Sequence, residues 1–148
     1  MIDIEVRDMT DSDLPQVMEI ENLCFKAPWP EKDINVELHD NAFSVMQVIT
    51  VNDKVVGFCD YWNTFETGTI CQIAIHPQYQ HQKLGSKLLD EVIKDAKAKK
   101  IRTLTLEVRE NNKKAITFYE KFGFKITLVK EQYYSNGENA IYMIKEVN

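Results

Sequence analysis

Hydrophobic and polar residues follow two different periods along this chain. Between positions 103 and 109, apolar side chains occupy every second position, at Leu104, Leu106 and Val108, which is typical of a strand with one buried face. Earlier in the chain the apolar period becomes that of an amphipathic helix. The apolar side of this helix carries Leu84, Leu88, Leu89, Val92 and Ile93. The sequence therefore predicts half-buried strands combined with amphipathic helices.

Turn and cap residues allow helices and strands to be assigned along the whole chain. Helices are predicted after the capping-box variant Thr10-Asp11-Ser12-Asp13, over residues 31–39, from Gly85 onward, and from Lys113 through Phe122. Strands are predicted over residues 4–7, 43–51, 54–62, 69–75, 103–109, 124–130 and 140–145, with hairpin turns at Asn52-Asp53 and Ser135-Asn136-Gly137. We expect one α/β (α+β) domain over residues 1–148, with a mixed, mostly antiparallel sheet flanked by helices.

One connection has the form of an anion-binding loop. The apolar run Ile73-Ala74-Ile75 ends at His76-Pro77, and a polar loop then leads into a helix at Gly85. The first backbone N–H groups of a helix have no partner within the helix, and its dipole favours a phosphate there. The loop has neither a Walker A pattern nor a G-x-G-x-x-G fingerprint. Because such units also occur without ligands, spacing alone leaves phosphate binding and a purely structural loop equally favoured.

The alternating strand at 103–109 leads into a second helix. The alternation places Glu107 on the face opposite Leu104, Leu106 and Val108. Asn111-Asn112 then interrupts the strand, and either residue can cap the following helix. The apolar side of that helix carries Ala115, Ile116, Tyr119 and Phe122, and Gly123 ends it.

These two segments together resemble the GNAT superfamily of acyl-CoA-dependent N-acetyltransferases. Residues 80–85 read QHQKLG against the family loop Q-x-x-G-x-G/A, with Lys83 where the family usually has its first glycine. Residues 106–124 read LEVRENNKKAITFYEKFGF and are very close to the family pattern. The segment FKAPW at residues 25–29 and Tyr133-Tyr134 resemble the RimI-like branch, the ribosomal-protein-alanine N-acetyltransferases.

The resemblance implies acetyl-CoA as co-substrate and assigns residues to its site. The main chain of Ile73, Ala74 and Ile75 would pair with the pantetheine arm and polarise the acetyl carbonyl, whereas their side chains are expected to pack in the core. Asn112 would contact the cofactor, a role compatible with a helix cap. The pyrophosphate loop would consist of His81, Gln82, Lys83, Leu84, Gly85 and Ser86.

Two side chains suit the acid and base that amide formation requires. A protein α-amino group has a pKa of ~8, so a carboxylate must accept a proton from it, and Glu107 is the candidate. Tyr119, protonated at neutral pH, is the candidate acid for the departing thiolate of coenzyme A. Without the family context, an exposed strand glutamate and a core tyrosine would explain both residues.

Lys83 leaves a further alternative open. A residue other than glycine costs strain where φ is positive, whereas its ammonium would attract phosphate. A non-catalytic acyl-CoA-binding module is therefore a second hypothesis. The presence of both Glu107 and Tyr119 argues against it, because binding alone needs neither group. Cys71 and Cys24 have no base motif nearby that would support covalent catalysis.

Charge suggests the class of acceptor. The net charge is −5, but residues 1–40 hold eleven acidic and three basic residues, a net of −8, and residues 41–148 have a net of +3. An acidic segment would attract a basic peptide, or it could simply be solvated. We expect the N-terminus of a protein, possibly a basic ribosomal protein starting with alanine, as acceptor; lysine side chains, polyamines and other small amines are the alternative.

Other partners and compartments are constrained by composition. A chain this acidic, without a basic stripe, is a poor partner for nucleic acid. No signal peptide or bilayer-length apolar run is seen, and the three scattered cysteines suit a reducing environment, so a cytoplasmic protein without membrane association is expected. The three histidines lack metal-ligand spacing, so no metal is expected. The oligomeric state is not predicted.

Overall fold

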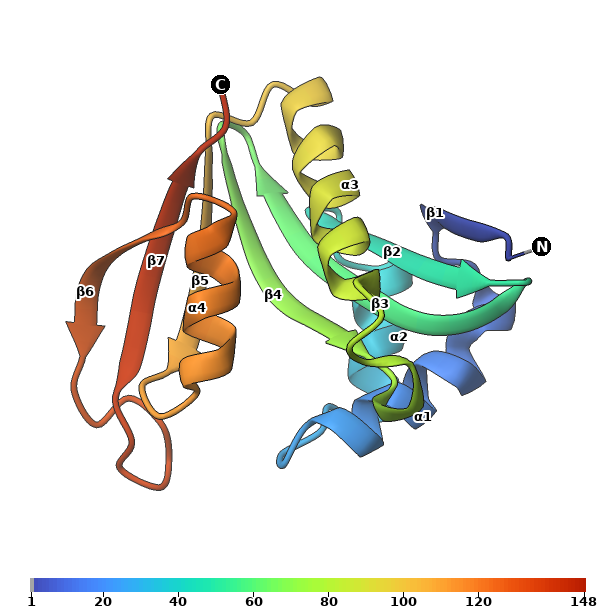
Figure 1. The fold of residues 1–148 in the computed structure, drawn as a ribbon, viewed down its shortest axis with the longest axis horizontal. Helices are drawn as coiled ribbons and strands as arrows, with labels where there is room; N and C mark the ends of the chain where they lie inside the picture. The colour runs from blue at the N-terminus through green and yellow to red at the C-terminus, as the bar shows by residue number, and fades with distance from the viewer. Residues whose placement is uncertain (1) are drawn as a thin grey trace.

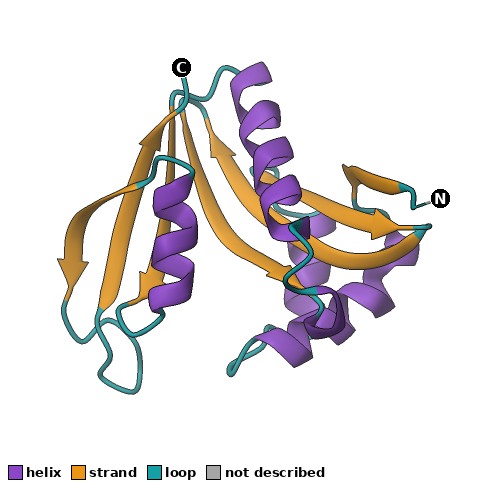
Figure 2. Ribbon diagram, viewed as in Figure 1, coloured by secondary structure: helices purple, strands orange, loops and turns teal. Residues whose placement is uncertain are grey.

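The computed structural model describes residues 2–148 as a seven-stranded sheet with helices on both faces (Figures 1 and 2). The strands are β1 (Ile4–Asp8), β2 (Ser44–Val51), β3 (Lys54–Thr64), β4 (Thr67–Ile75), β5 (Thr103–Arg109), β6 (Lys125–Lys130) and β7 (Ala140–Glu146). The helices are α1 (Leu14–Cys24), α2 (Glu31–His39), α3 (Leu84–Ala98) and α4 (Lys113–Lys121), with short 3-10 helices η1 (Asp11–Asp13) and η2 (Pro77–Tyr79). The predicted fold class is confirmed.

The sheet has the order β1-β2-β3-β4-β5-β7-β6, and only β4 and β5 are parallel. Their pairing covers Thr67 to Ile70 on β4 and Thr103 to Leu106 on β5, and then stops. The register between β3 and β4 shifts after Asp60, which is the signature of a β-bulge and bends the strand. The two halves of the sheet therefore diverge beyond Ile70, as Figure 1 shows for β4 and β5.

Each face of the sheet is covered by its own pair of helices. Helices α3 and α4 pack on one face, where Leu88, Leu104 and Met143 are completely buried. Helices α1 and α2 lie behind the sheet in Figure 1 and bury Val17, Ile34 and other apolar residues against it. Burial of apolar surface on both faces supplies most of the stabilisation of such a layered domain.

Helices α3 and α4 begin in different ways, α4 with a side-chain cap and α3 without one. The side chain of Asn112 accepts a hydrogen bond from the N–H of Ala115 at 3.2 Å, so the predicted cap of α4 is confirmed. Gly123 follows α4 with a φ of +93°, a conformation that favours glycine. At the start of α3, Lys83 has a left-handed conformation with φ of +65°. None of the helices within residues 2–148 combines the length and the apolar character needed to span a bilayer.

Candidate active site

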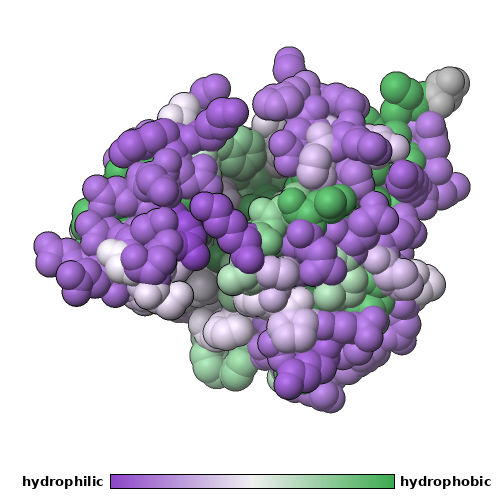
Figure 3. Space-filling view, turned by 90° about the horizontal axis from the view of Figure 1, so that it is seen from below, coloured by the Kyte–Doolittle hydropathy of each residue, from purple (hydrophilic) through white to green (hydrophobic). Residues whose placement is uncertain are grey.

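A cleft of about 650 Å³ opens where β4 and β5 diverge. Its walls come from the end of β4, the loop leading into α3, and the facing side of α4. Figure 3, seen from below, shows a hollow with hydrophobic residues at its floor between two more hydrophilic parts of the surface. The sequence-predicted cofactor residues that line this cleft are Ile73, Ala74, Ile75, His81, Lys83, Leu84, Gly85, Ser86 and Asn112. Of the predicted set, Gln82 does not line it.

The edge of β4 presents backbone groups to this cleft. The N–H of His76 donates to the Val56 carbonyl on β3, so by strand alternation the backbone groups of Ile73 and Ile75 turn away from β3. The Ile75 carbonyl accepts hydrogen bonds from Cys24 Sγ at 3.3 Å and from Gln80 Nε2 at 3.0 Å. The Ile75 carbonyl is thus already hydrogen-bonded within the protein. The N–H groups of Ile73 and Ile75 instead face the space between the diverging strands β4 and β5.

The loop between β4 and α3 is anchored from outside the cleft. Nδ1 of His76 accepts from the N–H of Gln78 at 3.1 Å, and its Nε2 lies 2.9 Å from Glu19 Oε1 on α1. The second contact is then a donation from Nε2 to the carboxylate. A buried histidine therefore fixes the start of the loop that leads to α3.

Gly85 gives a direct test of whether a phosphorylated ligand fits this loop. A Cβ at this position would lie 3.7 Å from Ile75 Cγ1 and 3.8 Å from Phe118 Cζ, which are ordinary contacts. The protein's own packing therefore does not require glycine here. A glycine that lines the cleft in the first turn of α3 instead keeps space for a ligand close to the helix N-terminus. These features fit the pyrophosphate of coenzyme A.

Tyr119 is held at the floor of the cleft with its ring in the core. Its ring packs edge-on against Phe118 and Phe124, with centroids 5.3 Å and 5.7 Å away, and only 8% of the residue is exposed. Burial raises the pKa of the Tyr119 hydroxyl above its ordinary value near 10. The hydroxyl is consequently protonated at neutral pH and is available as a proton donor inside the cleft.

Glu107 lies on the other side of the sheet from Tyr119. Its neighbours Leu106 and Val108 are buried among the residues of α3 and α4, so alternation points Glu107 to the opposite face, and it does not line the cleft. Its carboxylate accepts from Lys130 Nζ at 2.6 Å. A hydrogen bond with the same carboxylate raises the pKa of Tyr133. The two predicted catalytic residues therefore lie on opposite faces of β5.

The loop after β6 surrounds this second face. Arg109 stacks on the ring of Tyr134, 3.9 Å from its centroid, and Arg109 Nη1 pairs with Glu138 at 3.1 Å. Tyr133 remains about half exposed beside Glu107. The two tyrosines noted in the sequence thus lie on the Glu107 side of the sheet, outside the cleft.

Several acidic residues of the first forty positions are buried, which sequence reasoning missed. Glu21 is fully buried on α1, and its Oε1 accepts from the Trp29 N–H at 2.7 Å and from Gln72 Nε2 at 2.8 Å. These bonds fasten the segment between α1 and α2 to β4. Burial raises the pKa of Glu21, with opposing effects from the Trp29 and Gln72 hydrogen bonds. The acidic segment is therefore partly structural, and only its remaining carboxylates can attract a basic peptide.

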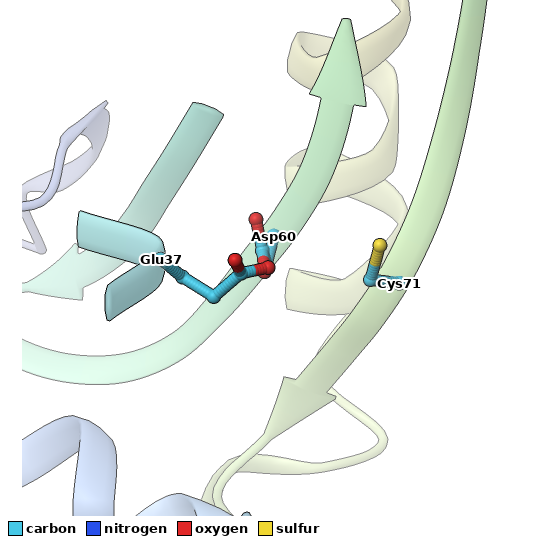
Figure 4. Close-up of side chains that lie close together, drawn as sticks. All are labelled: Glu37, Asp60 and Cys71. Carbon is cyan, nitrogen blue, oxygen red and sulfur yellow. The ribbon is translucent and has the colours of Figure 1, made fainter. Parts of the chain in front are cut away.

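Glu37 and Asp60 form a buried carboxyl pair next to Cys71 (Figure 4). Burial, followed by the contact with Glu37, raises the pKa of Asp60 to about 8. The pKa of Glu37 is lowered, because hydrogen bonds from Asp60, Asn41 and Trp62 outweigh its burial. These opposite shifts place one proton on Asp60 at neutral pH, so the pair carries one negative charge instead of two, while Asp60 Oδ2 stays buried without a hydrogen-bond partner among the described residues.

Comparison with known proteins gives the family of this chain. The model of the Acetyltransferase (GNAT) family matches residues 14–124. A curated relative from Bacillus subtilis (strain 168) is 35% identical over 144 residues, covering 97% of this chain and 95% of the relative. A relative from Escherichia coli (strain K12), named ribosomal protein bS18-alanine N-acetyltransferase, is 31% identical over 141 residues, covering 93% of this chain and 94% of the relative.

Solved structures point to the same family. The crystal structure of the ribosomal-protein-S18-alanine N-acetyltransferase from Escherichia coli has a TM-score of 0.91 at 30% identity, covering 99% of this chain and 95% of that chain. A Salmonella typhimurium protein described as yncA with its cofactor acetyl-CoA has a TM-score of 0.81 at 19% identity, covering 98% and 94%, which shows the shared fold. The chain belongs to the GNAT acetyltransferase family.

Proposed function

We propose that this protein transfers the acetyl group of acetyl-CoA to the N-terminal α-amino group of a protein, an alanine-initiated ribosomal protein. The observation that carries the chemistry is the buried Tyr119 hydroxyl, protonated at the floor of a cleft whose loop fits a pyrophosphate. The acceptor class rests on relatives of nearly full length that are named bS18-alanine N-acetyltransferases. The RimI-like segments at 25–29 and 133–134 support it.

The open edge of β4 orients the donor. The N–H groups of Ile73 and Ile75 face the cleft and can hold the pantetheine arm as a neighbouring strand would. A backbone N–H directed at the thioester carbonyl stabilises the negative charge that develops on its oxygen. Coenzyme A leaves as a thiolate when the carbon–sulfur bond breaks, and the Tyr119 hydroxyl gives it a proton. The tyrosine recovers a proton from solvent after the product leaves.

The acceptor amine has to lose its proton before or during attack. We assign this step to Glu107, either directly or through a water, because its carboxylate faces the side of β5 away from the cleft. The Lys130 ammonium donates to Glu107 Oε1 at 2.6 Å and holds the carboxylate in place on that face. Donor and acceptor then approach from opposite faces of the sheet and meet where β4 and β5 diverge.

Cofactor binding is tested by calorimetry with acetyl-CoA. The wild-type chain should bind, Gly85→Ala should bind more weakly, and Gly85→Val should lose most of the affinity, because each added group fills ligand space. Thermal unfolding serves as the fold control, since the Cβ contacts at Gly85 are ordinary. No heat of binding for the folded wild type would remove the enzymatic proposal.

The acid and base roles are separated by their response to pH. Tyr119→Phe loses only the hydroxyl, so it should fold, bind acetyl-CoA and lose about 10²- to 10⁴-fold in turnover. Raising the pH supplies neutral amine, so it should partly rescue Glu107→Gln and leave Tyr119→Phe unrescued. Tyr61→Phe is the matched control, because it removes a hydroxyl bound to Asp95 outside the cleft. Near-normal turnover in both active-site variants, with chemistry rate-limiting, would refute the assignment.

A further inference from the structure

Side chains of the kinds that bind metal ions come together between α2 and the sheet (Figure 4). Glu37 belongs to α2, Asp60 to β3 and Cys71 to β4, and none of the three lines the cleft. One carboxylate oxygen of each acid and the Cys71 sulfur lie within 4.8 Å of one another. Only 7% of Glu37 and 0% of Asp60 is exposed, so water does not solvate these acids as it solvates acidic residues on a surface.

The negative charge of this cluster is not balanced by a cation of the protein. Asp60 Oδ1 accepts from the Ser44 hydroxyl at 2.6 Å. Glu37 accepts from Trp62 Nε1 at 2.6 Å and from Asn41 Nδ2 at 2.7 Å, so every donor is neutral. Within residues 2–148, no lysine, arginine or histidine forms an ion pair with either acid. Because buried charges in proteins are paired or coordinate a metal ion, the cluster has the character of a cation site.

One oxygen of the cluster has no partner at all. Asp60 Oδ2 is buried and accepts no hydrogen bond from the described residues, although Asp60 Oδ1 does. Figure 4 shows the carboxyl groups of Asp60 and Glu37 directed at one another, with the Cys71 sulfur on the neighbouring strand. A buried polar atom without a partner is rare and costly, and a bound ion is one way of satisfying it. This oxygen is therefore a second indication, independent of the charge, that the cluster binds a cation.

The donor atoms select the kind of cation. Mg²⁺ and Ca²⁺ take about six to eight oxygen ligands, whereas carboxylate oxygens combined with a cysteine sulfur suit Zn²⁺. With Zn–O near ~2.1 Å and Zn–S near ~2.3 Å, the ligand atoms of a tetrahedral site lie about 3.5 Å apart. The donor atoms of the cluster would have to approach one another by at most about 1.3 Å to reach this geometry. Cys71 is partly exposed, so an ion can enter from its side.

We propose that Glu37, Asp60 and Cys71 bind a zinc ion, which joins α2 to β3 and β4. Two carboxylates and a thiolate, with water as the fourth ligand, make a tetrahedral site. Binding releases to solvent the proton of the Cys71 thiol and the proton that Asp60 carries in the metal-free protein. The site lies outside the cleft, so this inference goes beyond the proposed acetyl transfer and does not depend on it.

Metal titration of the wild type, after treatment with EDTA and desalting, tests the site. Calorimetry should show one Zn²⁺ bound per chain. The Tm should rise by about 5 °C when free Zn²⁺ exceeds its Kd roughly 100-fold, because the ion binds only the folded chain. Mg²⁺ at the same concentration should leave the Tm unchanged. Co²⁺ in place of Zn²⁺ should produce a thiolate-to-metal charge-transfer absorption, which a site made of carboxylates alone does not give.

Variants locate the bound ion. Cys71→Ser should abolish the cobalt absorption and weaken Zn²⁺ binding by at least about tenfold, the loss that even an outer-sphere partner causes. Asp60→Asn should lose Zn²⁺ binding as well. Cys24→Ser is the matched thiol control, because Cys24 is also partly buried but lies outside the cluster. His39→Gln removes the exposed His39–Asp11 pair, the surface contact best suited to adventitious zinc, and both controls should bind like the wild type.

The outcomes are distinct from those that test the proposed function. Absence of Zn²⁺ binding by the folded wild type overturns this inference and leaves acetyl transfer untouched. Unchanged affinity in Cys71→Ser, with circular dichroism showing a folded chain, places the ion elsewhere and also overturns it, as does a loss of binding in His39→Gln. If Asp60→Asn does not fold, the cobalt absorption of the wild type and its fate in Cys71→Ser still decide.

Discussion

Replacing Asp60 with asparagine should change how the stability of this protein depends on pH. Asp60 is fully buried, and its pKa is raised from 3.8 to about 8 by burial and by Glu37. In the unfolded chain the same carboxyl ionises near its ordinary pKa, so unfolding releases a proton between these two values. The contribution of Asp60 to stability is fully present below pH 3.8, and it is lost as pH rises through about 8.

The size of this effect follows from linkage. One proton released on unfolding changes the unfolding free energy by about 1.4 kcal/mol per pH unit, so the wild type should lose about 4 kcal/mol between pH 5 and 8 through Asp60. Asparagine has the same shape, and its NH₂ can donate to Glu37 as the protonated acid does, with no proton to lose. Asp60→Asn should therefore become progressively more stable relative to the wild type as the pH rises.

Urea unfolding followed by circular dichroism at pH 5, 6, 7 and 8 measures this difference. The exposed Asp33 on α2 supplies the control, because Asp33→Asn should give a curve nearly parallel to the wild type. If the Asp60→Asn and wild-type stabilities ran parallel across this range, Asp60 would be ionised in the folded protein. The assignment of one proton to the Glu37–Asp60 pair would then be wrong.

Further substitutions test other contacts. Gly57→Ala should lower the unfolding free energy by about 2 kcal/mol in urea, because its Cβ would lie 2.5 Å from Ile75 Cδ1 and 2.8 Å from the Ala74 carbonyl; an unchanged midpoint would contradict the close packing of β3 on β4. Lys130→Met removes the ammonium that donates to Glu107 Oε1 at 2.6 Å, so the carboxylate should lose its fixed position, and turnover should fall with little change in acetyl-CoA affinity. Unchanged turnover would show that this contact does not position Glu107 for catalysis.

Much of the fold could be predicted from the sequence because each element has local signals. The helix at 31–39 and the strand at 103–109 have the predicted bounds, because Pro30 directly precedes the helix and apolar residues alternate along the strand. The connection between β3 and β4 agrees less closely with the prediction. Strands were predicted to end at 62 and resume at 69, but they extend to Thr64 and begin at Thr67. The turn uses Phe65 at a φ of +63°, and phenylalanine gives no turn signal in a sequence.

The residues that line the cleft could be predicted from the sequence, whereas the buried carboxyl groups outside it could not. The loop and strand residues converge on one cleft because a strand, its loop and the next helix are continuous in the chain. The buried carboxyls Glu21, Glu37 and Asp60 could not be found in this way, because an acidic residue on a helix predicts an exposed face. Their burial depends on donors from distant segments, such as Gln72 and Trp62. Contacts of this kind leave no local pattern.

The central claim is that the acceptor is a protein N-terminus. The most direct measurement is mass spectrometry of a peptide panel incubated with the wild-type protein and acetyl-CoA. The panel contains alanine-, serine- and methionine-initiated peptides with basic residues following, an Nα-blocked peptide with free lysines, and spermidine. The account predicts an acetyl group on the α-nitrogen, fastest for the alanine-initiated peptide, and little product from the blocked peptide. Faster acetylation of lysine side chains or spermidine than of every free α-amine would contradict it.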